Sequence, residues 1–188
     1  MYEAQLVKQC APTLAGMKTG TLFGCAFPDA SALKECMRRW NRSLTPKGVR
    51  AIPARYQNGR AMIYLYRPAR LSADLRDGRA RQLLQARGYC PDCSECCVAR
   101  LMRRLSAYES FPHEVGLFLG YPPEDVSGFI EHRACGFKCV GCWKVYGDAE
   151  AAQKTFEKYK KCTDVYCNQF ANGRSLERLT VADGSHIL

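Results

Sequence analysis

The sequence predicts an α/β or α+β fold in which a single mixed sheet of about four to five strands is flanked by about six helices. Segments with strand patterns and segments with helix patterns alternate along the chain, which favours packed layers over an all-helical bundle. Asn58-Gly59 separates two apolar runs and predicts a β-hairpin, so we expect at least one antiparallel pair of strands. The 188 residues contain no repeat and no linker, so we expect residues 1–188 to form a single domain.

The clearest strands are expected in the first half of the chain. Residues 21–27 form an apolar run that ends at Pro28, which predicts a buried strand. Residues 49–55 and 61–66 flank the Asn-Gly turn and are expected to pair as the hairpin. Two further strands are expected near the C-terminus, over residues 139–146 and 176–182.

The expected helices follow from apolar residues spaced three and four apart, together with capping residues at their starts. Asp29 or Ser31 can cap a helix that ends near Leu44. The other expected helices cover residues 72–88, 92–107, 113–119, 124–132 and 148–168.

Positive charge is concentrated in the middle of the chain. The net charge is +10, yet residues 38–104 carry 16 Lys or Arg against four Asp or Glu, and the remainder carries 12 against 14. Such a field attracts phosphate-bearing ligands or nucleic acid, although a solvated arginine-rich helix face has the same composition. The hairpin adds side chains that contact phosphate and stack on bases, namely Arg50, Arg55, Arg60, Tyr56, Tyr64 and Tyr66.

The twelve cysteines are the most informative residues of the chain. The sequence shows no secretion signal, and no run approaches the roughly 18 apolar residues that span a bilayer. We therefore expect a cytoplasmic protein without membrane contact. Thiols stay reduced in the cytosol, where clustered cysteines indicate metal ligation, thiol chemistry or use as small core residues.

Seven of the cysteines form two clusters, Cys90, Cys93, Cys96 and Cys97 in the first and Cys135, Cys139 and Cys142 in the second. One C-x2-C pair from each cluster can form a tetrahedral zinc site. Its expected ligands are Cys90, Cys93, Cys139 and Cys142. The remaining three cysteines are alternate ligands for zinc or for an iron–sulfur cluster. Thiol redox chemistry and plain packing stay open, since Cys93 and Cys97 lie one helical turn apart on an apolar stripe.

A second interpretation is a small hydrolase or acyl-transfer enzyme. Cys10 precedes Ala-Pro-Thr, and at a helix start the backbone amides would lower its pKa. With His113 as base and Glu114 as the group that orients it, Cys10 would act as the nucleophile. Lys144 and Tyr146 alternate with apolar residues along an expected strand and are candidates to line a cofactor pocket, beside the alternative of a surface strand.

Several stretches resemble the signature of a bacterial protein family. They read Cys-Ala-Pro-Thr-Leu-Ala-Gly-Met-Lys at 10–18, Phe-Pro-His-Glu-Val-Gly-Leu-Phe-Leu-Gly-Tyr-Pro followed by Glu-Asp-Val-Ser-Gly-Phe-Ile within 111–130, and Cys-Trp-Lys-Val-Tyr-Gly-Asp at 142–148. The chain is similar over nearly its whole length to a Firmicutes-type family classed as domain of unknown function 3793. The resemblance implies a cytosolic bacterial protein of this length and implies no activity.

Together these patterns predict a cytosolic, cysteine-rich bacterial protein. Zinc or iron–sulfur binding is the leading interpretation of its chemistry, with thiol redox chemistry beside it. A Cys10–His113 enzyme is the first alternative, and a nucleic-acid-binding module acting through the hairpin is the second.

Overall fold

The computed structural model describes residues 2–107 and 111–184, and the chain divides into two compact units. The first unit comprises Met1–Ala69 and Lys161–Leu188, and the second comprises Arg70–Lys160. Helices α3 (Pro68–Asp74) and α8 (Ala149–Ala171) each contribute residues to both units. The single domain expected over residues 1–188 stays a prediction.

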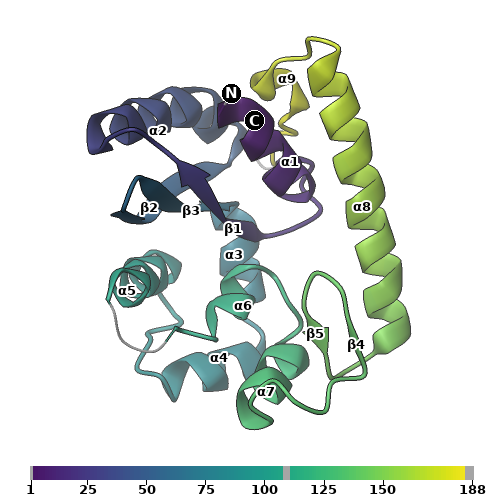
Figure 1. The fold of residues 1–188 in the computed structure, drawn as a ribbon. Helices are drawn as coiled ribbons and strands as arrows, with labels where there is room; N and C mark the ends of the chain where they lie inside the picture. Colours follow the sequence, from purple (N-terminus) through teal and green to yellow (C-terminus); the bar gives the residue numbers. More distant parts are fainter. Residues whose placement is uncertain (1, 108–110, 185–188) are drawn as a thin grey trace. The chain divides into compact units, whose positions relative to one another are not determined.

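The first unit is built on a three-stranded antiparallel sheet in the order β1-β3-β2 (Figure 1). Asn58 and Gly59 both have positive φ, 49° and 71°, which a two-residue turn between right-handed twisted strands requires. The predicted hairpin is therefore confirmed as the β2–β3 pair. The three strands are β1 (Gly20–Ala26), β2 (Arg50–Gln57) and β3 (Arg60–Tyr66).

One face of this sheet carries the hydrophobic core of the first unit. Phe23 of β1 lies opposite Ile63 of β3, and both side chains are buried in this core. Trp40, the largest buried side chain of the unit, is fully covered and packs near the Phe23 ring at 6.5 Å between ring centroids. The helices that complete the core are α1 (Tyr2–Leu14), α2 (Ala30–Leu44) and α9 (Leu176–Leu179).

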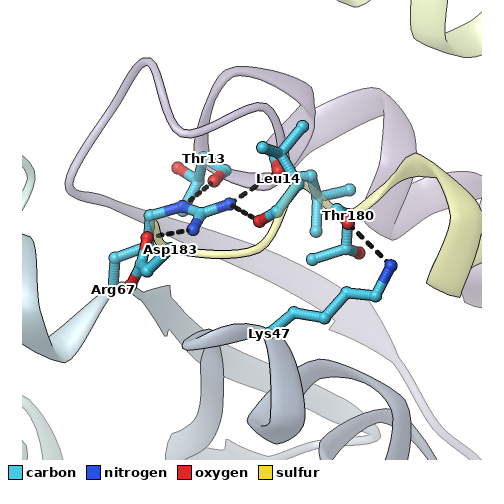
Figure 2. Close-up of polar contacts among 7 residues, drawn as sticks. Thr13, Leu14, Lys47, Arg67, Thr180 and Asp183 are labelled. Atoms are coloured by element: carbon cyan, nitrogen blue, oxygen red, sulfur yellow. Dashed lines mark hydrogen bonds and ion pairs between the residues drawn. The ribbon is translucent and has the colours of Figure 1, made fainter. Parts of the chain in front are cut away.

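Arg67, directly after β3, joins the end of α1 to the C-terminal segment (Figure 2). The side chain is 1% exposed. Its Nε donates to the carbonyl of Thr13, and its Nη2 donates to the carbonyls of Leu14 and Val181, all at 2.7 Å. Its Nη1 pairs with Asp183 Oδ1 at 2.5 Å. Because the last carbonyls of a helix have no partner within it, Arg67 both caps α1 and holds the C-terminal segment in place.

Lys47 makes a second attachment to the same segment. Its Nζ donates to the carbonyl of Thr180 at 3.0 Å (Figure 2). It also donates to the carbonyl of Glu177 at 2.6 Å. The backbone N–H of Asp183 donates in return to the carbonyl of Lys47 at 3.3 Å. Lys47 closes a short 3-10 helix, Thr45–Lys47, just before β2. We refer to Arg67, Lys47 and Asp183 as the C-terminal clasp.

The second unit consists of helices and one short hairpin, with a core of its own. Its helices are α4 (Gly78–Gln85), α5 (Ser94–Ser106), α6 (Val115–Phe118) and α7 (Pro123–Glu131). The hairpin pairs β4 (Cys139–Val140) with β5 (Lys144–Val145). Fully buried side chains in this unit include Leu71, Leu84, Cys97, Leu101, Phe118 and Val145.

Two buried carboxylates connect elements of the second unit. Glu114, at the start of α6, is 2% exposed, and its Oε1 accepts from the Tyr89 hydroxyl at 2.7 Å and from Arg104 Nη1 at 2.5 Å. Burial raises the pKa of the Tyr89 hydroxyl, and the hydrogen bond to Glu114 raises it further. The Tyr89 hydroxyl and the Arg104 guanidinium therefore both donate to the buried Glu114 side chain.

Asp125 of α7 connects this helix to the hairpin. It is 3% exposed, and its Oδ2 accepts from the indole Nε1 of Trp143 at 2.7 Å. Its Oδ1 accepts from the backbone N–H groups of Tyr146 and Gly147, each at 2.7 Å. One carboxylate thus satisfies three donors on the residues that flank β5, which compensates for its burial.

The expected single mixed sheet is wrong. The described residues form two separate sheets, a three-stranded one and the β4–β5 hairpin, and every strand pair in them is antiparallel. The coarser prediction of a fold that mixes helices and strands is confirmed. The described part of the chain contains nine α-helices, more than were expected, because α1 and α9 were not anticipated and one expected helix is divided.

The strand expected over residues 176–182 is wrong. The segment begins instead with α9, followed by irregular chain. Leu176 and Leu179 are both buried and lie three residues apart, which is a helical spacing and not the alternation of a strand. Ser175 begins this helix, because its side chain accepts from the N–H of Arg178 at 3.3 Å.

The helix expected over residues 72–88 is divided between α3 and α4. Asp77 causes the division, because its carboxylate accepts from the N–H groups of Arg79 and Ala80 at 2.9 and 3.0 Å and thereby starts a new helix. The helix expected after Asp29 is confirmed as α2, which Asp29 caps in the same way.

Candidate functional site

Cys93 and Cys96 are joined by a disulfide at the start of α5. They form a C-x-x-C pair with a sequence separation of 3, and the other ten cysteines in the described residues are thiols. The residues after this pair form helix α5, because their apolar side chains recur on one face of a helix. This face packs into the core of the second unit. The buried residues of this face are Cys97, Val98, Leu101 and Leu105.

Cys93 is the N-cap residue of α5. Its backbone is extended, with φ −122° and ψ 94°, and its Sγ accepts from the N–H of Cys96 at 3.2 Å. A side-chain oxygen usually fills this position at a helix start. The free amides of the first turn carry partial positive charge, which favours a thiolate over a thiol. When the disulfide is reduced, Cys93 is therefore well placed to carry negative charge.

The two sulfur-bearing residues differ in exposure. Cys96 is exposed, whereas Cys93 is half-buried. Because Cys96 is the more exposed residue, an attacking thiolate reaches it more easily, and Cys93 is then the leaving group. Two acidic side chains lie nearby in sequence. Asp92 pairs with Arg81 Nη2 at 2.7 Å, and Glu95 lies in the first turn of α5.

Cys97 and Cys90 lie next to the disulfide in sequence but differ from it in their surroundings. Cys97 is fully buried, and its Sγ donates to the carbonyl of Cys90 at 3.1 Å. Burial raises the pKa of the Cys97 thiol, and the neighbouring Cys90 thiol raises it further. Cys97 thus behaves as a small core residue, while Cys90 is an exposed free thiol.

The second cysteine cluster lies in and before the β4–β5 hairpin. Cys139 begins β4, whereas Cys135 and Cys142 are exposed in the adjoining loops. Among the residues that the structure describes, no three His, Cys, Asp or Glu side chains are arranged to hold a metal ion. The zinc site expected from the two C-x2-C pairs stays a prediction, and one of its ligands, Cys93, is bonded here to Cys96.

Lys144 and Tyr146, the candidates for cofactor binding, lie on β5 and directly after it. Lys144 Nζ donates to the carbonyl of Ala134 at 2.8 Å and lies 4.6 Å from the centroid of the Phe137 ring. The Tyr146 ring stacks on the ring of His132, with 5.7 Å between centroids. Both side chains are therefore engaged within the second unit, and their role with a cofactor stays a prediction.

The surroundings of Cys10 and Glu114 do not favour the roles expected for them in acyl transfer. Cys10 lies in the C-terminal half of α1 instead of at a helix start, and it is fully buried in the core of the first unit. Burial raises the pKa of its thiol strongly, which disfavours the thiolate. The Glu114 carboxylate is paired with Arg104, and the His113 ring packs on the Phe129 ring at 5.0 Å between centroids. The acyl-transfer activity stays a prediction.

The buried thiols predict a loss of stability at alkaline pH. Burial raises the pKa of Cys36 from 9.0 to about 11 and raises that of Cys10 further. Above about pH 9 the unfolded chain releases these protons while the folded chain keeps them, so the free energy of unfolding falls as pH rises toward 11. Urea unfolding followed by circular dichroism at several pH values is expected to give steadily lower midpoints over this interval. The Cys36→Ala variant is expected to show a smaller fall, and an equal fall would contradict the assignment.

The basic hairpin offers fewer aromatic rings to a nucleic acid than the sequence suggests. Tyr64 and Tyr66 are buried and stack on each other, with ring centroids 4.7 Å apart. The Tyr56 hydroxyl donates to the carbonyl of Phe27 at 3.2 Å. Because a buried ring cannot stack on a base, nucleic-acid binding here would depend on the arginine charges, and it stays a prediction.

The fold and the site together define a cysteine-rich α+β protein with a C-x-x-C disulfide at the start of a helix. The chain belongs to the family described as protein of unknown function (DUF3793), whose family model matches residues 6–180. The resemblance carried by the signature stretches is thereby confirmed. Neither a curated protein nor a solved structure gives a significant match to the chain. None of the helices in the described part of the chain is both long and apolar enough to cross a membrane.

The sequence contains a signal for the disulfide, although the spacing of the cysteines predicts Cys96 only as an alternate metal ligand. A C-x-x-C pair directly before the apolar stripe of a helix is the pattern of many redox-active dithiols. The neighbours Cys90 and Cys97 obscured this signal, because four cysteines within residues 90–97 allow several pairings.

Proposed function

We propose that the protein carries out thiol–disulfide exchange at Cys93 and Cys96. The observation that carries the proposal is the bond between these two residues at the start of α5, with Cys96 exposed and Cys93 accepting a backbone N–H. Helix N-termini and C-x-x-C pairs both lower the pKa of a cysteine thiol. The pair therefore combines access for a partner thiol with a stabilised leaving group.

The exchange proceeds in two balanced steps. A thiolate of a dithiol reductant attacks Cys96 Sγ, the Cys93–Cys96 bond breaks, and Cys93 leaves as a thiolate beside the Cys96 N–H. The second thiolate of the reductant then attacks the mixed disulfide and releases Cys96. The reductant ends as a disulfide, and the protein has gained two electrons and two protons. The reverse sequence reduces a substrate disulfide.

A purely structural role explains the bond less well. A disulfide stabilises mainly by closing a loop in the unfolded chain, and the loop here joins residues separated by only 3 positions. The start of α5 is also exposed, whereas structural disulfides gain protection from burial. The cytosolic location expected from the sequence fits the same proposal, because disulfides in that compartment are mostly transient and catalytic.

The test is a redox titration of the full chain. The protein is equilibrated in buffers of defined glutathione ratio, free thiols are alkylated, and the Cys93–Cys96 peptide is quantified by mass spectrometry. We expect one two-electron transition with a midpoint between about −270 and −120 mV, the interval of known thiol–disulfide oxidoreductases. A midpoint below about −300 mV is that of a structural disulfide and would overturn the proposal.

Single cysteine variants test the direction of attack. In glutathione disulfide, Cys93→Ser is expected to accumulate a mixed disulfide at Cys96, whereas Cys96→Ser is expected to react several-fold more slowly at the less exposed Cys93. Cys36→Ser, which changes a buried core thiol, is the matched control and is expected to titrate like the parent protein. Equal rates in the Cys93 and Cys96 variants would contradict the proposed direction.

The same preparation distinguishes zinc binding from thiol–disulfide exchange. Protein purified without oxygen is analysed for metal before the titration. If the protein contains stoichiometric zinc, and both the Cys93→Ser and the Cys139→Ser variants lose it, then both residues are ligands. This outcome would contradict the proposed thiol–disulfide exchange and support a zinc site.

A further inference from the structure

A pocket between α4 and α7 in the second unit plays no part in the proposed thiol chemistry. Its volume is about 330 Å³, at the lower end of the range of small-molecule sites. Helices α4 and α7 pack against each other, so both walls belong to regular elements. Helix α4 contributes Arg79 and Leu83 to the lining, the turn after it contributes Arg87, and α7 contributes Ser127, Ile130 and Glu131.

The wall formed by α4 and the turn after it carries two arginines with a leucine between them in sequence. Arg79 and Leu83 lie four residues apart on one face of α4, and Arg87 follows in the turn after the helix. The apolar Leu83 lies between the two arginines in sequence and lines the same pocket. An elongated ligand can therefore meet a guanidinium at one end and an apolar surface along its body.

The charge of the lining is positive. Glu131 is its single acidic residue, and the Ser127 hydroxyl donates to its carboxylate at 3.1 Å. Arg87 is held in place, because its Nη1 donates to the carbonyl of Leu83 at 3.0 Å and its Nε lies 3.8 Å from Glu114 Oε2. A guanidinium has five N–H donors, so Arg87 retains donors beyond these contacts.

We propose that this pocket binds a small organic anion, with its carboxylate or phosphate group on Arg79 or Arg87 and its apolar body on Leu83 and Ile130. Arginine suits both head groups because its fork of donors matches two oxygens at once. The apolar residues of the two helices favour a ligand with an aliphatic or aromatic body over a bare inorganic ion.

The test is calorimetric titration of the full chain with four probes: 4-phenylbutyrate, phenyl phosphate, the neutral alcohol 4-phenyl-1-butanol and inorganic phosphate. At least one of the two aromatic anions is expected to bind about tenfold or more tightly than both the alcohol and inorganic phosphate. Comparison of 4-phenylbutyrate with phenyl phosphate identifies the preferred head group. Equal binding of the aromatic anions and the alcohol, or of the aromatic anions and inorganic phosphate, would overturn the proposal.

Variants locate the binding. Arg79→Gln and Arg87→Gln are each compared with Arg76→Gln, which removes the same charge from an exposed arginine outside the pocket. At least one pocket variant is expected to weaken the preferred anion about tenfold, whereas the control is expected to leave the affinity unchanged. Because Arg87 also contacts Glu114, amide chemical shifts of the parent protein are mapped as well. Shifts that avoid α4 and α7, or equal losses in all three variants, would place the anion elsewhere and contradict the proposal.

Discussion

Replacing Arg67 with methionine is expected to lower the free energy of unfolding by about 3–5 kcal/mol, the largest single effect that we predict on stability. The substitution keeps an apolar stem of similar length but removes the guanidinium that binds the carbonyls of Thr13, Leu14 and Val181. These carbonyls lose their shared donor, and Asp183 loses its ionic partner. Urea unfolding monitored by circular dichroism measures the change.

Arg178→Met is the matched control for this experiment. Arg178 is an exposed arginine in α9, next to the segment that the C-terminal clasp holds, and its replacement is expected to change stability by less than about 0.5 kcal/mol. Asp183→Asn separates the ionic contribution from the carbonyl contacts. It is expected to have the smaller effect, because the Asp183 side chain is 20% exposed. Similar losses in Arg67→Met and Arg178→Met would show that the clasp does not stabilise the fold.

Asp125→Ala is expected to cost about 3–4 kcal/mol, since hydrogen bonds to a charged and buried acceptor are among the strongest in proteins. The substitution leaves the Trp143 indole N–H and the backbone N–H groups of Tyr146 and Gly147 without their common acceptor. The loss is expected to fall on the hairpin. The indole ¹⁵N–¹H signal of Trp143 should shift toward the position of a free indole, and urea unfolding should give the free energy.

Glu124→Ala provides the control at the neighbouring position. Glu124 is exposed in the first turn of α7, where its charge interacts favourably with the helix dipole, so we expect a loss below about 1 kcal/mol. An unchanged Trp143 indole signal in Asp125→Ala, or equal losses in the two variants, would contradict the role assigned to Asp125.

The sequence predicted correctly those elements that depend on residues close together in the chain. The hairpin was predicted because Asn58 and Gly59 adopt positive φ readily, and α2 was predicted because Asp29 precedes an apolar stripe. The apolar residues of 176–182 also fit a short extended run, so the sequence predicts a strand there. The helical start of this segment depends on the core of the first unit, into which Leu176 and Leu179 pack.

The site was only partly accessible to the same reasoning. The clustering of cysteines around residues 90–97 was a sound indication of thiol or metal chemistry, but it did not select a pair. Cys10 was a reasonable candidate nucleophile until its burial in α1 was known. Reactivity depends on exposure and on nearby amides, and neither can be read from the spacing of cysteines alone.

Local signals in the amino-acid order were sufficient for the mixed α and β class, for the β2–β3 hairpin and for several helix starts. Those features depend on contacts between residues a few positions apart. The tertiary structure alone revealed that Cys93 pairs with Cys96, that Asp125 joins α7 to the hairpin, and that Arg67 meets Asp183 across a sequence separation of 116. A buried charge is tolerated only where distant groups supply its partners, and the chain brings such groups together only when it folds.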